Sequence, residues 1–159
     1  MRKSDREIKD IGDILSVLKK CEIARLGLSD KGVPYVVPLH FAIEEQNGAI
    51  IVFFHCAGAG RKLDIMRENP MACFEADRVE KILRRELACN FTTAYESVIG
   101  FGKLSIIDDT KEKTHALSLI VKKLGFVGEP SFSSEALAAT TVLRLPLDEV
   151  SGKRHDPKK

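Results

Sequence analysis

The residues most able to do chemistry lie between positions 51 and 64, where an apolar run of strand type ends at His55. Two glycines follow in a short turn, and a helical pattern then begins with the cations Arg61 and Lys62. Glycine lets a backbone approach a ligand closely, and the first turn of a helix presents unpaired N–H groups and a partial positive charge. This order of residues predicts a cradle for a phosphate group, with His55 facing whatever the phosphate carries.

The same stretch also fits a simpler interpretation, an ordinary strand-to-helix turn with solvated cations, because glycines are common in turns. His55 has two interpretations as well. An imidazole that exchanges a proton near neutral pH suits acid–base catalysis, but a histidine at a strand end often only hydrogen-bonds or packs. No metal site is expected, because the 4 cysteines form no C-x-x-C pair.

The composition predicts one domain over residues 1–159, since a chain of this length with 44% hydrophobic residues can bury a single core. Its 25 basic residues balance 23 acidic ones, which gives no case for a nucleic-acid-binding surface. No apolar run approaches the roughly 20 residues of a membrane helix, and no signal peptide is evident, so the expected location is the cytoplasm. Residues 153–159 are interpreted as a solvated tail.

Hydrophobic spacing predicts short strands joined by tight turns, with few helices between them. The first 20 residues are expected to hold an amphipathic helix from about residue 8. Strands are expected at 23–28, 33–43, 49–55, 71–76, 87–91, 97–107 and 141–147, and further helices at 61–69, 109–124 and 135–139. The charged segment 77–85 receives no assignment.

This pattern indicates a mainly β fold, a closed antiparallel barrel with helices packed outside it. A doubly wound parallel sheet is excluded because most strands are not followed by a helix. Pro34 and Pro38 cannot donate ladder hydrogen bonds, so the strand at 33–43 must lie at an edge or be bulged.

Six short motifs follow one another along residues 20–154. They are Arg25-Leu-Gly, Gly32-x-Pro-Tyr-Val-Val-Pro-Leu, Phe54-His-x-Ala-x-x-Gly-x-Lys62, Asn69-Pro-x-x-Cys-Phe-Glu, Tyr95-x-Ser-Val-x-Gly-x-Gly-Lys103 and Gly152-Lys. Together and in this order, the set resembles the FMN-binding split-barrel family related to pyridoxamine 5′-phosphate oxidase. It is most similar to the branch of 5-nitroimidazole-resistance (Nim) proteins.

The resemblance implies a homodimer of six-stranded antiparallel split β-barrels with flanking helices and with two FMN molecules at the subunit interface. Lys62 and the hydroxyl of Ser97 would hold the flavin phosphate, while the backbone at Pro38 and Leu39 would face the isoalloxazine ring. His55 would lie beside the flavin as the catalytic residue. The other implied cofactor contacts are Ala57, Arg61, Leu63, Asn90 and Tyr95.

Three departures from the family pattern concern the site. Glu96 stands where many relatives carry an arginine, so a carboxylate replaces a cation expected near the phosphate. Phe91 stands where many relatives have a tryptophan. The C-terminal residues that hold the substrate phosphate in pyridoxamine phosphate oxidases have no match, so that activity is not expected.

The resemblance therefore implies an FMN-dependent oxidoreductase that reduces a small aromatic or nitro-substituted molecule. In such a protein the flavin does the electron chemistry, and the chain supplies binding, orientation and electrostatics. The alternative is a flavin- or haem-binding carrier or sensor without turnover. It is favoured by the lack of a G-x-G-x-x-G fingerprint for a nicotinamide donor. Neither a nucleic acid nor a membrane is an expected partner.

Overall fold

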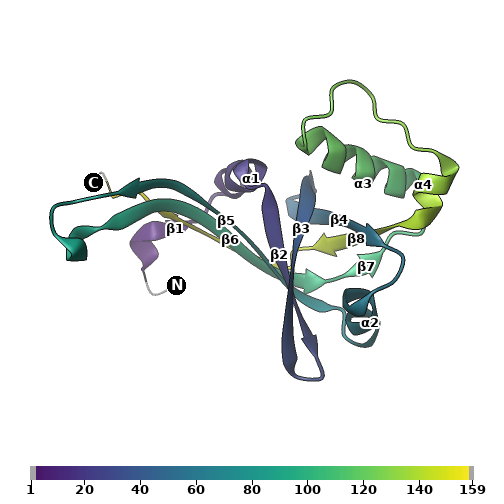
Figure 1. Ribbon diagram of the computed structural model, residues 1–159, viewed down its shortest axis with the longest axis horizontal. Coiled ribbons are helices and arrows are strands. Elements are labelled where there is room, and N and C mark those ends of the chain that lie inside the picture. The colour runs from purple at the N-terminus through teal and green to yellow at the C-terminus, as the bar shows by residue number, and fades with distance from the viewer. Residues whose placement is uncertain (1–2, 158–159) are drawn as a thin grey trace.

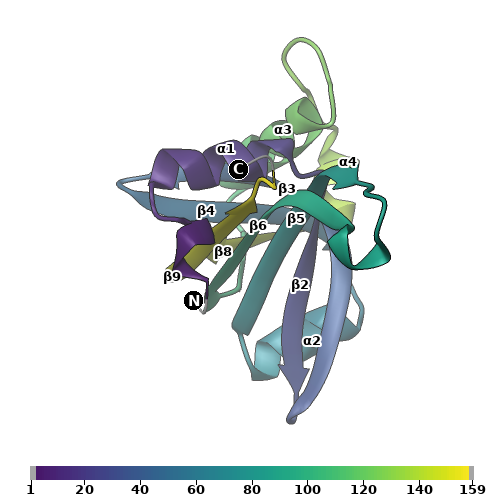
Figure 2. The same ribbon diagram turned by 90° about the vertical axis from the view of Figure 1, so that its left-hand side faces the viewer.

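The computed structural model describes residues 3–157, which form one antiparallel sheet with four α-helices around it (Figure 1). The strands are β1 (Glu7–Ile8), β2 (Ile23–Asp30), β3 (Val33–Gln46), β4 (Ala49–Ala57), β5 (Met71–Leu83), β6 (Thr92–Lys103), β7 (Ser105–Ile106), β8 (Thr140–Pro146) and β9 (Glu149–His155). The helices are α1 (Ile11–Lys20), α2 (Arg61–Glu68), α3 (Thr110–Lys123) and α4 (Ser134–Ala139). Across the sheet the strand order is β1-β9-β6-β5-β2-β3-β4-β8-β7. Figure 2 shows α1 and α3 toward one end of the central strands and α2 toward the other.

The mainly β, antiparallel architecture is confirmed, but the prediction of a closed, six-stranded barrel is wrong. The described residues form nine strands, and no ladder among them joins the edge strands β1 and β7. These two strands have 2 residues each, too few to show an alternating pattern in the sequence. The sheet curls until β6 approaches β8, and there Gly102 lies against the backbone of Pro146.

The long strand β3 divides the sheet into two halves. Its residues 33–40 pair with β2, and its residues 41–46 pair with β4. Figure 1 shows the β2–β3 hairpin in the middle of the molecule, with the β5–β6 hairpin on one side and β4 and β8 on the other. Pro34 and Pro38 both lie in the part of β3 that has only β2 as a neighbour among the described residues, which is where proline is tolerated.

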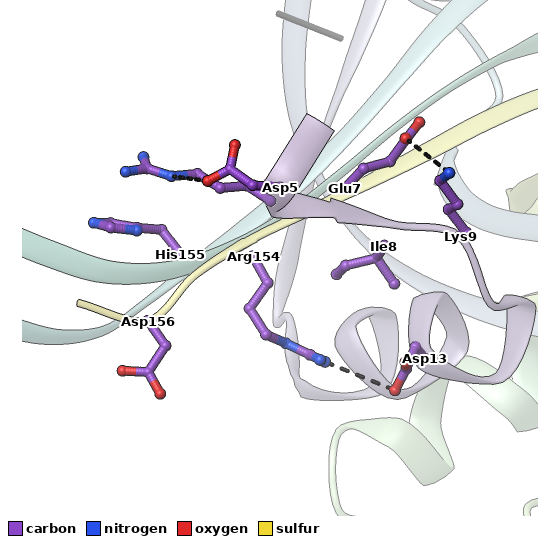
Figure 3. A pocket seen from close by; sticks show the side chains of 9 residues that line it. Asp5, Glu7, Ile8, Lys9, Asp13, Arg154, His155 and Asp156 are labelled. Atoms are coloured by element: carbon purple, nitrogen blue, oxygen red, sulfur yellow. Dashed lines mark ion pairs between the residues drawn. The ribbon is translucent and has the colours of Figure 1, made fainter. Parts of the chain in front are cut away.

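Two segments that were predicted otherwise join the edge of the sheet. Lys153–His155 are not a solvated tail but the end of β9, which pairs with β6 and β1. The predicted first helix begins only at Ile11, because Ile8 belongs to β1 and its side chain is buried. Figure 3 shows Arg154 reaching from β9 to Asp13 of α1, where Nη2 and Oδ1 are 3.9 Å apart.

The β5–β6 hairpin also differs from the prediction. The unassigned charged segment continues β5 as far as Leu83, and because it is largely exposed on both faces it lacks an apolar alternation. Residues 87–91, predicted as a strand, contain instead a 3₁₀ helix at Ala88–Asn90 that leads the chain into β6. The hairpin is therefore longer than the sequence pattern indicates.

The predicted helices after the glycine turn and after Asp109 are confirmed. The Asp109 side chain accepts hydrogen bonds from the N–H groups of Lys111 and Glu112 and so caps α3. None of the helices in residues 3–157 is long and apolar enough to span a membrane.

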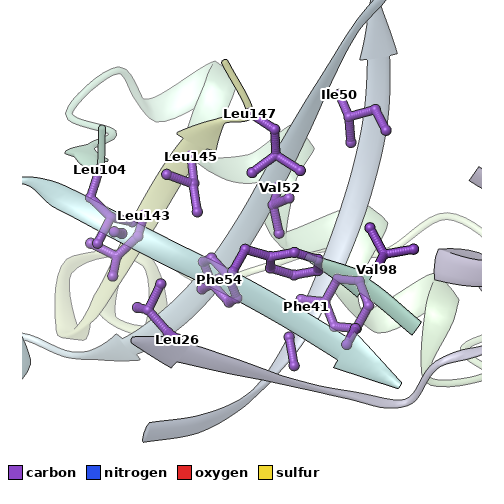
Figure 4. Packing of buried hydrophobic residues seen from close by; sticks show 14 of the residues in the cluster. Leu26, Phe41, Ile50, Val52, Phe54, Val98, Leu104, Leu143, Leu145 and Leu147 are labelled. Atoms are coloured by element: carbon purple, nitrogen blue, oxygen red, sulfur yellow. The ribbon is translucent and has the colours of Figure 1, made fainter. Parts of the chain in front are cut away.

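The main core fills the inside of the curled sheet (Figure 4). The rings of Phe41 and Phe74 meet edge to face with their centroids 5.4 Å apart, and the centroid of Phe54 lies 6.3 Å from that of Phe74. Helices α1 and α2 add the buried residues Ile14, Val17, Leu18, Leu63, Ile65 and Met66. Leu63, in the first turn of α2, thereby anchors the start of this helix in the core.

A second, smaller core lies between α3 and the outer face of β4 and β8. Phe53 and Val142 from the strands belong to the same buried cluster as Leu117 and Ile120 from the helix. Strand β4 is buried on both faces, which explains why its sequence is a continuous apolar run rather than an alternating one.

The outer face of β3, β2, β5 and β6 carries apolar side chains that the described chain leaves uncovered. Val36, Met71, Val79, Ile99 and Phe101 are between 41% and 59% exposed. The registers of the four strands place all of them on one face. An exposed apolar surface of this kind is typical of an interaction site.

Candidate functional site

The candidate site lies where β3 and β4 part. Their ladder ends at the pair Phe41–Phe54, so within the described chain residues 38–40 and 55–57 lack a partner strand on the sides that face each other. Two strand edges therefore present backbone N–H and C=O groups at one place, which we call the strand split. The predicted cofactor residues at the strand split are Pro38, Leu39, His55 and Ala57.

His55 is half-buried, on the face of β4 that α3 covers. It lines an apolar pocket of about 230 Å³ together with side chains of α3 and α4. Its Nδ1 is buried and has no hydrogen-bond partner among the described residues, which is uncommon for a buried polar atom. Burial lowers the pKa of His55, and the nearby His40 lowers it further, so the imidazole is neutral at pH 7.

Helix α2 begins beside the strand split, after Gly60, whose φ of 139° favours glycine. No side chain caps this helix, although the Gly60 carbonyl accepts hydrogen bonds from the N–H groups of Leu63 and Asp64 at 2.9 and 3.3 Å. Lys62 is half-buried in the first turn. Burial raises the pKa of the neighbouring Cys56 thiol, and the ammonium of Lys62 opposes that rise. An uncapped helix N-terminus with a lysine suits an anion.

Three predicted contacts lie away from the strand split. Arg61 points to the β2–β3 turn, where its Nη2 is 3.2 Å from Asp30 and its guanidinium lies 4.9 Å from the centroid of the Tyr35 ring. The side chain of Leu63 is fully buried in the core. Asn90 is exposed at the far end of the β5–β6 hairpin. Side chains of successive helical residues point about 100° apart, so Arg61 and Lys62 point in different directions and cannot contact one small ligand equally well.

A second group of polar side chains lies on β6, β9 and the segment before β1, and we call it the arm cluster. Its members are Arg6, Tyr95, Ser97, Lys153 and His155. Ser97 stands opposite Lys153, and Tyr95 stands opposite His155 with the ring centroids 5.8 Å apart. A hydrogen bond from Lys153 lowers the pKa of the Tyr95 hydroxyl, and Arg6 acts in the same direction. Cations and hydroxyls on one face suit an anion.

Sequence reasoning identified Tyr95 and Ser97 but missed Arg6 and Lys153 as site residues. Arg6 lies in the segment interpreted as leading into the first helix, and Lys153 lies in the segment interpreted as a tail. The only signal for Lys153 was the short Gly152-Lys motif. The signal for Arg6 is the pairing of β1 with β9, which a sequence pattern of two residues cannot show.

The strand split and the arm cluster share the outer face of the sheet but are not adjacent. Pro38 and Ser97 are separated by β2 and β5, which is three inter-strand steps or roughly 14 Å. Between them Arg25 forms ion pairs with Glu75 at 2.8 Å and with Asp77 at 2.5 Å. One chain therefore does not bring Ser97 to its own strand split.

Glu96 lies on the opposite face from Ser97, because successive side chains of a strand alternate. The residue is only 3% exposed, and its carboxylate accepts hydrogen bonds from Arg154 at 2.7 Å and Arg78 at 3.3 Å, with Lys20 Nζ 3.7 Å away. Burial alone would raise the pKa of Glu96, but these three cations outweigh burial and lower it. The carboxylate thus joins α1, β5 and β9 and does not repel an anion at Ser97.

Replacing Glu96 with alanine is expected to lower the free energy of unfolding by about 2–3 kcal/mol. The change removes two charge-assisted hydrogen bonds, but the cost stays below that of a fully buried pair because Arg154 and Lys20 keep side-chain exposures of 40% and 46%. Urea denaturation measures the effect. The control is Glu86→Ala in the exposed hairpin loop, and equal stability of the two variants would contradict a structural role for Glu96.

The comparisons with known proteins agree with this geometry. The family model described as pyridoxamine 5′-phosphate oxidase matches residues 10–154. A solved structure from Bacteroides thetaiotaomicron, described as a candidate 5-nitroimidazole antibiotic resistance protein, has a TM-score of 0.81 and 28% identity over 93% of this chain and 86% of that one. No curated protein sequence is detectably similar.

Two further solved structures share the fold. A flavocytochrome from Azotobacter vinelandii has a TM-score of 0.80 at 24% identity, covering 98% of this chain and 72% of that one. An FAD- and haem-binding protein from Mycobacterium smegmatis has a TM-score of 0.80 at 18% identity, covering 95% and 74%. Because the family match spans most of the described chain, this protein belongs to the pyridoxamine 5′-phosphate oxidase family and has a candidate 5-nitroimidazole-resistance protein among its structural relatives.

Proposed function

We propose that this protein is an FMN-dependent oxidoreductase that reduces a small aromatic or nitro-substituted molecule. The observation that carries the proposal is the strand split, where Lys62 and an uncapped helix N-terminus follow the end of β4 that carries His55, a neutral imidazole. The relatives support it, since one is described as a candidate 5-nitroimidazole-resistance protein and another as binding FAD and haem.

Separate groups at the strand split suit the phosphate and the isoalloxazine ring of FMN. The phosphate would be held by Lys62 and by N–H groups of the first turn of α2. Gly58 leaves room for it, because a Cβ there would meet nothing closer than Thr141 Oγ1 at 4.0 Å. The unpaired edge of β3 at Leu39 would hydrogen-bond the polar edge of the isoalloxazine ring. Bound FMN would supply the electrons.

His55 would handle the proton that a polar acceptor takes up when it is reduced. Its neutral ring carries one N–H donor and one acceptor nitrogen, and general acid–base catalysis needs such a group within hydrogen-bond reach. Its position on β4, between two buried cores, holds the ring in place.

We further propose a homodimer with FMN at the interface. The exposed apolar face that includes Val36, Ile99 and Phe101 needs a cover, and a second copy of the chain supplies one. The arm cluster of one subunit would then complete the strand split of the other and add Ser97 and Lys153 to the phosphate contacts. The expected buried area is well above about 1,000 Å².

Sedimentation velocity at micromolar concentration tests the dimer. The unchanged protein is expected to sediment as a dimer, while Phe101→Asp, which puts a charge on the proposed interface, is expected to dissociate it and to release flavin. Val127→Asp is the control, because Val127 is 91% exposed in the segment after α3. A monomer with flavin still bound would contradict the proposal.

Lys62→Ala is expected to weaken FMN binding by about one to two decades while leaving riboflavin binding nearly unchanged. The reason is the loss of one charge-assisted contact to the phosphate, which is typically about 1.5–3 kcal/mol. Fluorescence titration of the flavin-free protein with both ligands measures the effect. Lys111→Ala, at an exposed position on α3, is the control. Equal weakening of both ligands would place Lys62 away from the phosphate.

A second candidate function is a flavin- or haem-binding carrier without turnover. The observation that favours it is the imidazole of His55 on the wall of an apolar pocket, since imidazole is a common haem ligand. The absorbance spectrum of the purified protein separates flavin from haem, and steady consumption of NAD(P)H by the FMN-loaded protein separates an enzyme from a carrier. The four free cysteines favour the reducing cytoplasm for either function.

A further inference from the structure

The pocket beside His55 is formed by a single chain and lies under α3, on the outer face of β4. Its volume is about 230 Å³. The apolar part of its wall comes from Leu117 and Ile120 of α3, from Leu124 just after that helix, and from Phe132 and Ala136 before and in α4. Leu124 is 54% exposed, so the pocket has an apolar rim that faces solvent.

The pocket contains little polar chemistry. His55 and Thr140 are the polar residues that line it, and none of its lining residues is charged at neutral pH. The hydroxyl of Thr140 donates to the carbonyl of Ala136 at 2.8 Å, so its proton is already used. The imidazole of His55 is therefore the polar group on the wall that has no such bond, and its Nδ1, itself closed off from solvent, has no partner among the described residues.

We infer that this pocket binds an uncharged aromatic ring of about the size of benzene to indole, with His55 as its polar contact. The role of this ring rests on the proposed function, in which it would be the electron acceptor. The volume supports the size, because an apolar cavity of roughly 150 Å³ already holds benzene and drug-sized ligands need about 300–1,000 Å³. The lining supports the lack of charge, because a buried ion without a partner is strongly disfavoured.

The pocket is also distinct from the place proposed for the flavin phosphate. Lys62 and Cys56 are neighbours, and Cys56 packs with the main core while His55 points to the face beneath α3. The adjacent residues His55 and Cys56 thus point to opposite faces of β4. His55 points to the apolar pocket, and Cys56 points to the side of Lys62 and the proposed anion site. A phosphorylated ligand would be held at Lys62 and kept out of the pocket.

Isothermal titration of the protein of residues 1–159 with indole and with indole-3-carboxylate tests the inference. We expect indole to bind with one site per chain and at least ten-fold more tightly than the carboxylate. Ala136→Phe, which fills the pocket from α4, is expected to weaken indole at least ten-fold. Ala138→Phe is the matched control, because it lies two residues further on the same helix and does not line the pocket.

A second measurement covers the case in which Ala136→Phe does not fold. The ring resonances of His55 in the unchanged protein are expected to shift when indole is added and to stay in place with indole-3-carboxylate. Equal affinity for the two probes, no indole binding at millimolar concentration, or equal binding by the Ala136 and Ala138 variants would overturn the inference.

Different results would contradict the pocket inference and the proposed function. Indole binding by a protein that binds no flavin keeps the pocket and removes the oxidoreductase. In FMN-loaded protein that reduces a neutral nitroaromatic, indole is expected to inhibit competitively. Reduction that indole does not inhibit would remove the acceptor role of the pocket while leaving the oxidoreductase in place.

Discussion

His55→Ala is expected to keep its flavin and to lose about two orders of magnitude in the rate at which the reduced protein passes electrons to a nitroaromatic acceptor. General acid–base catalysis commonly contributes about 10²–10⁴-fold, and alanine removes the proton carrier without touching Lys62. The effect depends on geometry that the structure provides, a half-buried imidazole at the strand split that faces an apolar pocket.

Stopped-flow reoxidation of the FMN-loaded protein measures this rate directly. The matched control is His115→Ala, because His115 lies on the exposed side of α3 and its Nε2 is 2.9 Å from Glu44, away from the pocket. An unchanged rate in His55→Ala would leave His55 with a packing or hydrogen-bonding role only. Flavin loss in the same variant would instead make it a cofactor contact.

Gly102→Ala is expected to be the most destabilising single-methyl change in this chain, at about 3 kcal/mol or more in the free energy of unfolding. A Cβ at this position would overlap the carbonyl oxygen of Pro146, which is backbone and cannot rotate away. The contact lies where the curled sheet brings β6 against β8, so relief requires the two halves of the sheet to move apart.

Gly27→Ala is the control, since Gly27 is also a strand glycine but its Cβ would meet Cys73 at an ordinary 3.4 Å. That change is expected to stay within about 1 kcal/mol, because alanine loses less backbone entropy than glycine on folding. Urea denaturation of both variants measures the difference. Similar stabilities would mean that β6 and β8 have room to separate.

The sequence predicts best where one segment carries its own pattern. The run from Ile51 to Asp64 shows its buried strand, its glycine turn and its helix directly, and the structure has all three. The cap at Asp109 is equally local. Here each residue's conformation is decided by near neighbours, so spacing and residue type are sufficient.

The sequence predicts poorly where distant segments decide the outcome. Lys153 belongs to a strand only because β1 and β6 lie on either side of β9. Glu96 is buried only because Arg78, Arg154 and Lys20 come to it from three other elements. Arg61 turns from the strand split because Asp30 is close. No periodicity encodes such contacts, since each depends on the finished topology.

The position of β9 between β1 and β6 has a consequence for the order of folding. Residue 7 pairs with residue 153, and residue 97 also pairs with residue 153, so both contacts wait for one late segment. During synthesis, the β5–β6 hairpin therefore exists for some time with the hydrogen-bonding edge of β6 open. Contacts of such long sequence separation form slowly. A ribosome-bound chain that ends before β9 would thus be the species of this protein most exposed to aggregation and most in need of a chaperone.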